Sequence, residues 1–71
     1  MRISYDERTD SLYLRLKETP YYESEELKEG VLLDYDDKGN VIGIEILDAS
    51  EYLSPDELAS LTYSVEKAIT R

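Results

Sequence analysis

Apolar and polar residues alternate along several short stretches of the chain, and this alternation predicts four to five β-strands. The clearest stretch, residues 30–50, predicts two strands joined by the turn Asp37-Lys38-Gly39-Asn40. Alternation with a period of two is typical of strands that bury one face. The predicted strands span about residues 1–5, 11–16, 21–27, 31–36 and 41–47.

Burial of one face decides how the last two strands pair. The predicted pairs are Tyr35 with Ile42, Leu33 with Ile44 and Val31 with Ile46, which gathers apolar residues on one face. A slip of one residue would mix apolar and polar residues on both faces, so this register is strongly specified. The turn then centres on Lys38-Gly39, where the glycine can adopt a positive φ.

The last part of the chain predicts an α-helix over about residues 55–70. Ser54 can cap this helix, Pro55 takes its first position and Glu57 its third, as in a capping box. An apolar stripe follows at helical spacing: Leu58, Leu61, Val65, Ala68 and Ile69. Residues 1–71 are therefore expected to form a single α+β domain, a small antiparallel β-meander of four to five strands with one C-terminal α-helix packed on the sheet.

The composition is strongly acidic, and this charge indicates which kinds of macromolecule the protein can bind. Asp and Glu number 17 against 8 Lys and Arg, for a formal net charge of −9. Phosphate binding requires clustered basic residues, so we expect no nucleic-acid partner. The same charge attracts a basic protein. No apolar run approaches the ~18 residues that span a bilayer and no signal peptide opens the chain, so a cytoplasmic protein without membrane contact is expected.

One acidic cluster resembles a calcium-binding loop. Asp34, Asp36, Gly39, Val41 and Glu45 occupy positions 1, 3, 6, 8 and 12 of the pattern found in EF-hands. Position 5 is Lys38, however, which brings a cation where a ligand oxygen is needed. The flanking segments also read as strands, and an extended strand would carry Glu45 away from the turn. An acidic β-hairpin explains the same residues, so we expect no metal site and no other cofactor.

The chain also lacks the groups that usually carry out catalysis. It contains no Cys and no His, and it has neither a phosphate-binding loop nor a positioned nucleophile. Paired carboxylates can perform acid–base chemistry, but neighbouring carboxylates follow here from their density alone. We therefore predict that the protein is not an enzyme.

The sheet face opposite the apolar face is the candidate interaction surface. Its residues are Leu32, Asp34, Asp36, Val41, Glu45 and Leu47. If the helix covers only one face, the apolar residues of the other need a loop or a second subunit, so a homodimer is one expected arrangement. Tyrosines suit such contacts because they combine a large apolar ring with a polar tip. The tyrosines predicted to be exposed are Tyr13, Tyr21, Tyr22 and Tyr63.

Two segments of the chain resemble a known family. The first contains Ile3-Ser4-Tyr5-Asp6 and Asp10-Ser11-Leu12-Tyr13-Leu14-Arg15-Leu16. The second contains Gly30-Val31-Leu32-Leu33-Asp34-Tyr35-Asp36 and Gly39-Asn40-Val41-Ile42-Gly43-Ile44-Glu45-Ile46-Leu47-Asp48-Ala49-Ser50. Over about residues 1–50 the chain resembles the small bacterial and archaeal family catalogued as domain of unknown function 2283 (YuzE-like). The resemblance brings no activity, cofactor or catalytic residue, and it allows an antitoxin-like role against a small basic toxin.

Two functional hypotheses remain open, beside a purely structural homodimer. The first is a non-enzymatic, acidic protein-interaction module that binds a basic protein through carboxylates and exposed tyrosines. The alternative is a small-ligand or metal-binding domain that uses the side of the sheet carrying Asp34, Asp36 and Glu45.

Overall fold

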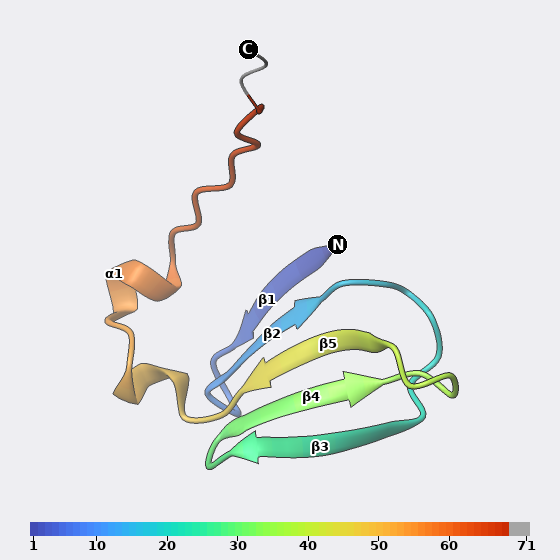
Figure 1. The fold of residues 1–71 in the computed structure, drawn as a ribbon. Coiled ribbons are helices and arrows are strands. Elements are labelled where there is room, and N and C mark those ends of the chain that lie inside the picture. The colour runs from blue at the N-terminus through green and yellow to red at the C-terminus, as the bar shows by residue number, and fades with distance from the viewer. Residues whose placement is uncertain (69–71) are drawn as a thin grey trace.

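The computed structural model describes residues 1–68 and shows one antiparallel sheet with two short helical turns at one end (Figure 1). The strands are β1 (Arg2–Asp6), β2 (Ser11–Arg15), β3 (Glu23–Lys28), β4 (Val31–Tyr35) and β5 (Val41–Ile46). The helical turns are the 3₁₀ turn η1 (Ala49–Glu51) and the α-helix α1 (Pro55–Leu58). The five predicted strands and their antiparallel pairing are confirmed.

The order of the strands across the sheet is β1-β2-β5-β4-β3. Two runs of neighbouring strands, β1–β2 and β3–β4–β5, are consecutive along the chain, as a meander requires. The predicted meander would also place β3 beside β2, but here β2 lies beside β5, with Leu14 opposite Ile44, and β3 forms the far edge. Residues 16–22 therefore carry the chain past β5 and β4 before β3 begins (Figure 1).

The hairpin of β4 and β5 keeps most of its predicted register. Leu33 pairs with Ile44 and Val31 with Ile46, which confirms two of the three predicted pairs. The third is wrong, because Tyr35 pairs with Val41 and a β-bulge displaces Ile42. The turn explains the shift.

That turn holds one residue more than a two-residue hairpin loop. The backbone N–H of Asp36 donates to the carbonyl oxygen of Asn40 at 3.0 Å, which leaves Asp37, Lys38 and Gly39 in the loop. Gly39 has a φ of 81°, the left-handed conformation expected for it. The bulge in β5 absorbs the extra residue. At the bulge, the carbonyl oxygen of Ile42 accepts hydrogen bonds from the N–H groups of Leu16 and Lys17. These bonds join the hairpin to the end of β2.

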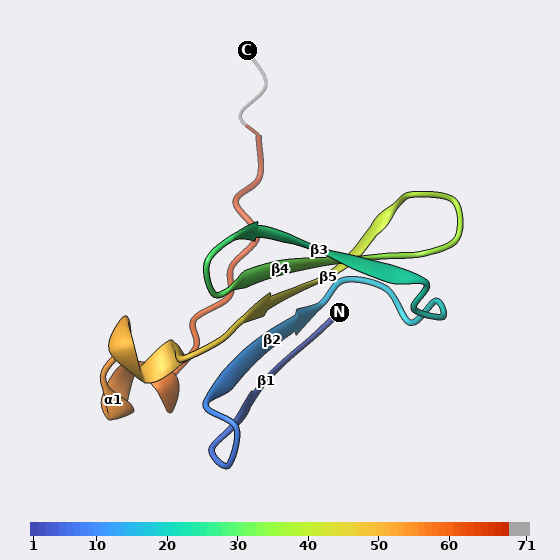
Figure 2. The ribbon, with the colours of Figure 1, turned by 90° about the horizontal axis from the view of Figure 1, so that it is seen from below.

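The apolar face of the sheet is only partly covered. Cross-strand partners share a face, so Leu14, Leu33 and Ile44 lie together on it, and all three remain half-exposed. The fully buried hydrophobic side chains among the described residues are Ile42 and Ala49 alone. Figure 2 shows why: η1 and α1 sit at one end of a single twisted sheet and do not lie across it.

The predicted C-terminal helix is much shorter in the structure. Its first turn forms as expected, with the Ser54 side chain accepting from the N–H of Glu57 and the Glu57 carboxylate accepting from the N–H of Ser54. The helix then ends at Leu58, so the prediction over 55–70 is wrong from residue 59 to 68, and residues 69–70 lie outside the described part. Within residues 1–68 no long helix packs on the sheet.

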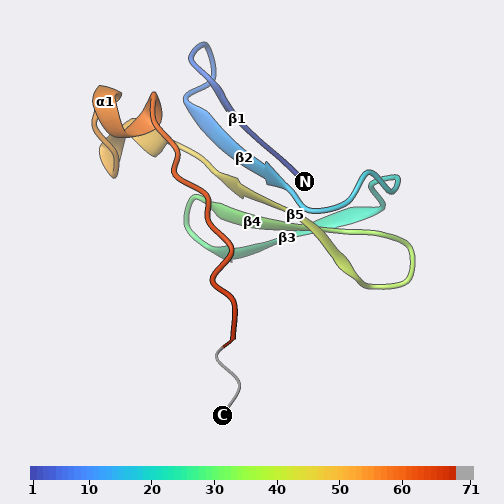
Figure 3. The ribbon, with the colours of Figure 1, turned by 90° about the horizontal axis from the view of Figure 1, so that it is seen from above.

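A competing pattern explains the early end of the helix. Leu61, Tyr63 and Val65 alternate with Thr62, Ser64 and Glu66, so this segment fits a period of two as well as a helical stripe. β-Branched and aromatic residues lose side-chain freedom in a helix and fit better in extended backbone. Residues 59–68, which we call the C-terminal arm, accordingly leave α1 without regular secondary structure (Figure 3).

Candidate functional site

The predicted interaction residues do not form one open patch. Leu32 and Glu45 are opposite one another in β4 and β5 and are half-exposed. Val41 and Leu47 lie at or just beyond the two ends of β5, so they do not meet. The two aspartates of the set are buried, Asp34 with 6% of its surface exposed and Asp36 with 8%. Each has a structural explanation.

Asp34 is covered by Tyr13, which lies across the sheet from β2. The Tyr13 hydroxyl donates to Oδ2 of Asp34 at 2.8 Å, and the side chain passes over Gly43 of the intervening β5. A Cβ atom on Gly43 would lie 2.6 Å from the Tyr13 hydroxyl oxygen. The sequence interpretation that Tyr13 is exposed is therefore wrong, because it is half-buried. A glycine inside an apolar strand is the signal that could have revealed this close approach.

The same cluster includes Arg15. Its Nη1 donates to the Tyr13 hydroxyl at 3.3 Å, while Nε and Nη2 donate to the carbonyl oxygens of Lys17 and Thr19, both at 2.6 Å. Burial raises the pKa of the Tyr13 hydroxyl; the Arg15 contact opposes that shift and the Asp34 contact adds to it. Tyr13 therefore remains a neutral donor at physiological pH. The cluster fixes the start of the β2–β3 connection.

Asp36 organises the hairpin turn. Its Oδ1 accepts from the backbone N–H groups of Lys38 and Asn40, both at 2.9 Å, and its Oδ2 accepts from the Asn40 side chain at 3.2 Å. These hydrogen bonds, led by the one from the Asn40 backbone, lower the pKa of the Asp36 carboxyl. Both oxygens are thus used inside the turn.

The carboxylates of this region are not arranged as a metal site. In residues 1–68, no group of three or more His, Cys, Asp or Glu side chains is placed to hold a metal ion. Asp34 accepts a hydrogen bond from Tyr13, and Asp36 is occupied by its own turn. The resemblance of this stretch to a calcium loop reflects the polar residues that a tight hairpin needs.

A second cluster, which sequence reasoning missed, joins the first hairpin to η1. Asp10 Oδ1 accepts from the Tyr5 hydroxyl at 2.7 Å and from the Ser50 N–H at 3.0 Å, and Oδ2 accepts from the Ser50 hydroxyl at 2.6 Å. The Asp10 carbonyl oxygen accepts from the N–H of Ala49, one of the two buried hydrophobic residues. Asp10 has a φ of 55°, which aspartate tolerates better than most residues. Since Asp10 and Ser50 are 40 residues apart, no local pattern predicts this contact.

This cluster changes the pKa of two of its members. The Ser50 hydroxyl and then the Tyr5 hydroxyl stabilise the Asp10 carboxylate and lower its pKa. The carboxylate in turn raises the pKa of Tyr5 to about 12. Both shifts favour a charged aspartate and a neutral tyrosine, which is the state that holds the two segments together.

The family model decides the assignment of the chain. The model described as protein of unknown function (DUF2283) matches residues 2–50. The chain belongs to the DUF2283 family. The comparisons with curated proteins and with solved structures gave no match.

The matched region of this DUF2283 protein contains all five strands and ends at Ser50, so it includes both polar clusters. The helix α1 and the C-terminal arm lie beyond it. In the described part of the chain, no helix has the length and apolar character needed to cross a membrane.

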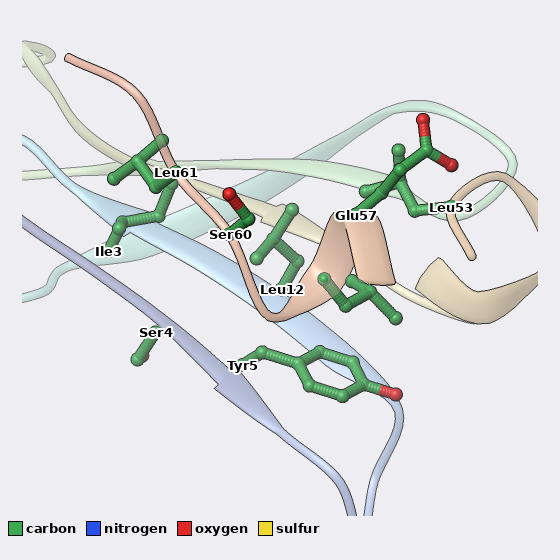
Figure 4. Close-up of a pocket in the computed structure, with 9 residues that line it drawn as sticks. Ile3, Ser4, Tyr5, Leu12, Leu53, Glu57, Ser60 and Leu61 are labelled. Carbon is green, nitrogen blue, oxygen red and sulfur yellow. The ribbon is translucent and has the colours of Figure 1, made fainter. Parts of the chain in front are cut away.

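A shallow hollow separates α1 from the first hairpin of the DUF2283 sheet (Figure 4). Its lining residues are Ile3, Ser4, Tyr5, Leu12, Leu53, Glu57, Leu58, Ser60 and Leu61. The one ionisable carboxylate among them, Glu57, is held by the N–H of Ser54 in the capping box. The rest of the lining is largely apolar.

Within residues 1–68, the backbone of the DUF2283 sheet remains without a strand partner at its two edges, β3 and β1. Every residue of β3 is exposed, and β3 pairs only with β4. Tyr21 and Tyr22 precede it with 56% and 63% of their surfaces exposed, which confirms the predicted exposure of both. At the opposite edge, β1 pairs only with β2 and is exposed except at Tyr5.

Proposed function

We propose that this DUF2283 protein is a non-enzymatic interaction module that binds an extended, basic segment of a partner protein along the free edge of β3. The observation that carries the proposal is the composition of that edge. Three of its six residues, Glu23, Glu25 and Glu26, are glutamates, and all six residues are exposed. A basic toxin of the kind that antitoxins neutralise would present suitable chemistry.

The backbone of an edge strand is a ready template for another strand. Its outward N–H and C=O groups have no strand partner, so an extended peptide can pair with them and continue the sheet. Carboxylates directly opposite like charges destabilise a strand pair, whereas opposite charges stabilise it. The β3 edge therefore discriminates against acidic strands, including a second copy of itself, and favours basic ones.

Two further features support a basic partner. The formal net charge of −9 attracts a cationic protein from a distance and accelerates its association. Tyr21 and Tyr22 are placed next to the first residue of β3, where their rings can cover the aliphatic stems of incoming lysine or arginine side chains. Leu32, from the predicted surface, pairs with Glu26 and adds an apolar neighbour to the edge.

A synthetic peptide with alternating lysine and valine tests the proposal directly. Its binding to the full chain, followed by fluorescence anisotropy, should weaken steeply between low and high salt, because salt screens exposed charges. The double variant Glu23→Lys, Glu25→Lys should weaken binding about tenfold, or ~1.4 kcal/mol. The matched control Glu7→Lys, Asp56→Lys makes the same change in net charge at exposed sites away from β3 and should have a smaller effect.

A modified peptide separates strand pairing from simple charge attraction. N-methylation of its backbone preserves every charge but removes the N–H groups that a strand donates. The proposal requires this peptide to bind much more weakly than the parent. Equal binding by the two peptides, or equal losses in the β3 variant and its control, would show that charge alone acts and that β3 is not the site.

A further inference from the structure

The C-terminal arm carries large apolar side chains that its own chain leaves mostly exposed. Leu61 is 65% exposed, and Tyr63 and Val65 are each 69% exposed. The arm borders a shallow apolar hollow beside Met1, Ile3 and Leu14, but it does not fill it. In Figure 1 it then runs from α1 away from the sheet. Three large, exposed apolar side chains at alternate positions of one segment indicate a contact surface.

The pattern of the arm fits a strand. Leu61, Tyr63 and Val65 would share one face, and the polar Thr62, Ser64 and Glu66 the other, because successive side chains of a strand point to opposite faces. β1 has the same pattern, with Ile3 and Tyr5 on the apolar face of the sheet. An arm paired with β1 would extend that apolar face by one strand.

The two edges of the sheet differ in their suitability for the arm. Residues 61–66 carry one charged side chain, Glu66, and β1 carries one residue of each sign, Arg2 and Asp6. At β3 the arm would meet three glutamates and only one basic residue, Lys28. Like charges across a strand pair are destabilising, so β1 is the favoured edge.

We infer that the arm of one copy pairs as a sixth strand with the β1 edge of a second copy, so that the protein forms an arm-exchanged homodimer. A second copy is the occupant because the arm's own path leads away from its sheet, while every copy offers both a free arm and a free β1 edge. The exchange is reciprocal, which closes the assembly at two copies. It covers the apolar side chains of the arm and leaves the acidic β3 edge open. The inference does not depend on the proposed function of that edge.

The oligomeric state of the full chain gives the first test. Sedimentation should show a dimer that dissociates on dilution. The variant Tyr63→Asp should abolish it, because a strand places Tyr63 beside Leu61 and Val65, whereas a helix would place it on the opposite side from them. The control Thr62→Asp, Ser64→Asp alters the polar side of the same segment and should retain the dimer. Because these residues are exposed, all of the variants should leave the sheet itself folded.

Hydrogen exchange identifies the edge that is used. As the concentration rises and dimer forms, amides of β1 should gain protection, and amides of β3 should serve as an unchanged reference. A monomer at every concentration, a dimer that survives Tyr63→Asp, or new protection on β3 in place of β1 would each overturn the inference.

The salt dependence distinguishes dimer formation from the proposed peptide binding at β3. Two copies of charge −9 should associate more readily as the salt concentration rises, whereas a basic peptide should bind less tightly.

Discussion

Tyr13 and Asp34 are joined by a 2.8 Å hydrogen bond that passes beside Gly43, the residue of the intervening strand β5 that lies opposite Asp34. The contact depends on the missing side chain of that glycine, since a Cβ atom would lie 2.6 Å from the Tyr13 hydroxyl oxygen and 3.4 Å from Asp34 Oδ2. Three neighbouring strands are thus linked through one polar contact, and each of the three residues can be tested.

Gly43→Ala should destabilise the fold by about 1–3 kcal/mol, as expected for overpacking a buried site. The added methyl group must displace the Tyr13 ring and its hydrogen bond. Urea unfolding followed by far-ultraviolet circular dichroism measures the change. In a Tyr13→Leu background the same substitution should have a smaller effect, because the clashing hydroxyl is gone. An equal loss in both backgrounds would mean that Tyr13 is not what the methyl group meets.

Tyr13→Phe should destabilise the fold by about 1–3 kcal/mol, because it leaves the buried Asp34 carboxylate without its donor. Tyr22→Phe is a matched control that removes a hydroxyl from an exposed tyrosine. Its effect on the free energy of unfolding should be close to zero. If the two variants are equally stable, the Tyr13–Asp34 contact contributes nothing to the fold.

Asp10 should make stability depend on pH in the acid range. Its native pKa lies below the ordinary 3.8, chiefly because the Ser50 hydroxyl donates to the carboxylate. A lowered native pKa gives stability that is complete above the unfolded value and lost as pH falls through the native one. Asp10→Asn should therefore lower stability at pH 7 and flatten its decline below about pH 4. A variant that declines as steeply as the parent would assign that pH dependence to other carboxylates.

Tyr5 should make the stability of the fold decrease as pH rises in the alkaline range. Its hydroxyl donates to Asp10, and its native pKa is about 12 against an ordinary 10.0. A raised native pKa gives stability that is fully present below the unfolded value and is lost as pH rises toward the native one. Stability should thus fall between about pH 10 and 12, and Tyr5→Phe should reduce that fall. Absorbance at 295 nm, which reports tyrosine ionisation, supplies the matching titration.

The sequence predicted the parts of this fold that local pattern controls. Alternation located the strands and paired Leu33 with Ile44, because one face must be buried. The pairing of β2 with β5 was not predictable in the same way, since alternation says which residues share a face and not which strand lies beside it. The length of α1 was overestimated because the residues after Leu58 fit two periods at once.

The polar clusters show a second limit of sequence reasoning. Asp34 and Asp36 were assigned to a candidate interaction surface because of their acidity and their sheet face, whereas both are buried. Their hydrogen-bond donors decide this outcome: Tyr13 for Asp34, and the turn's own backbone for Asp36. The Asp10–Ser50 contact had no sequence signal, because it depends on how two distant turns meet.

Divalent cations should leave the stability of the protein unchanged, which tests the ligand-binding alternative. A ligand that binds only the native state must raise its stability. Here Asp36 would have to exchange hydrogen bonds from Lys38 and Asn40 for a metal ion, with the Lys38 side chain in the same turn. Thermal unfolding with millimolar calcium, magnesium or manganese should match unfolding with chelator at equal ionic strength. A stabilisation by one cation that Asp36→Asn abolishes would restore the metal site, whereas one that survives this substitution would reflect screening of the net negative charge.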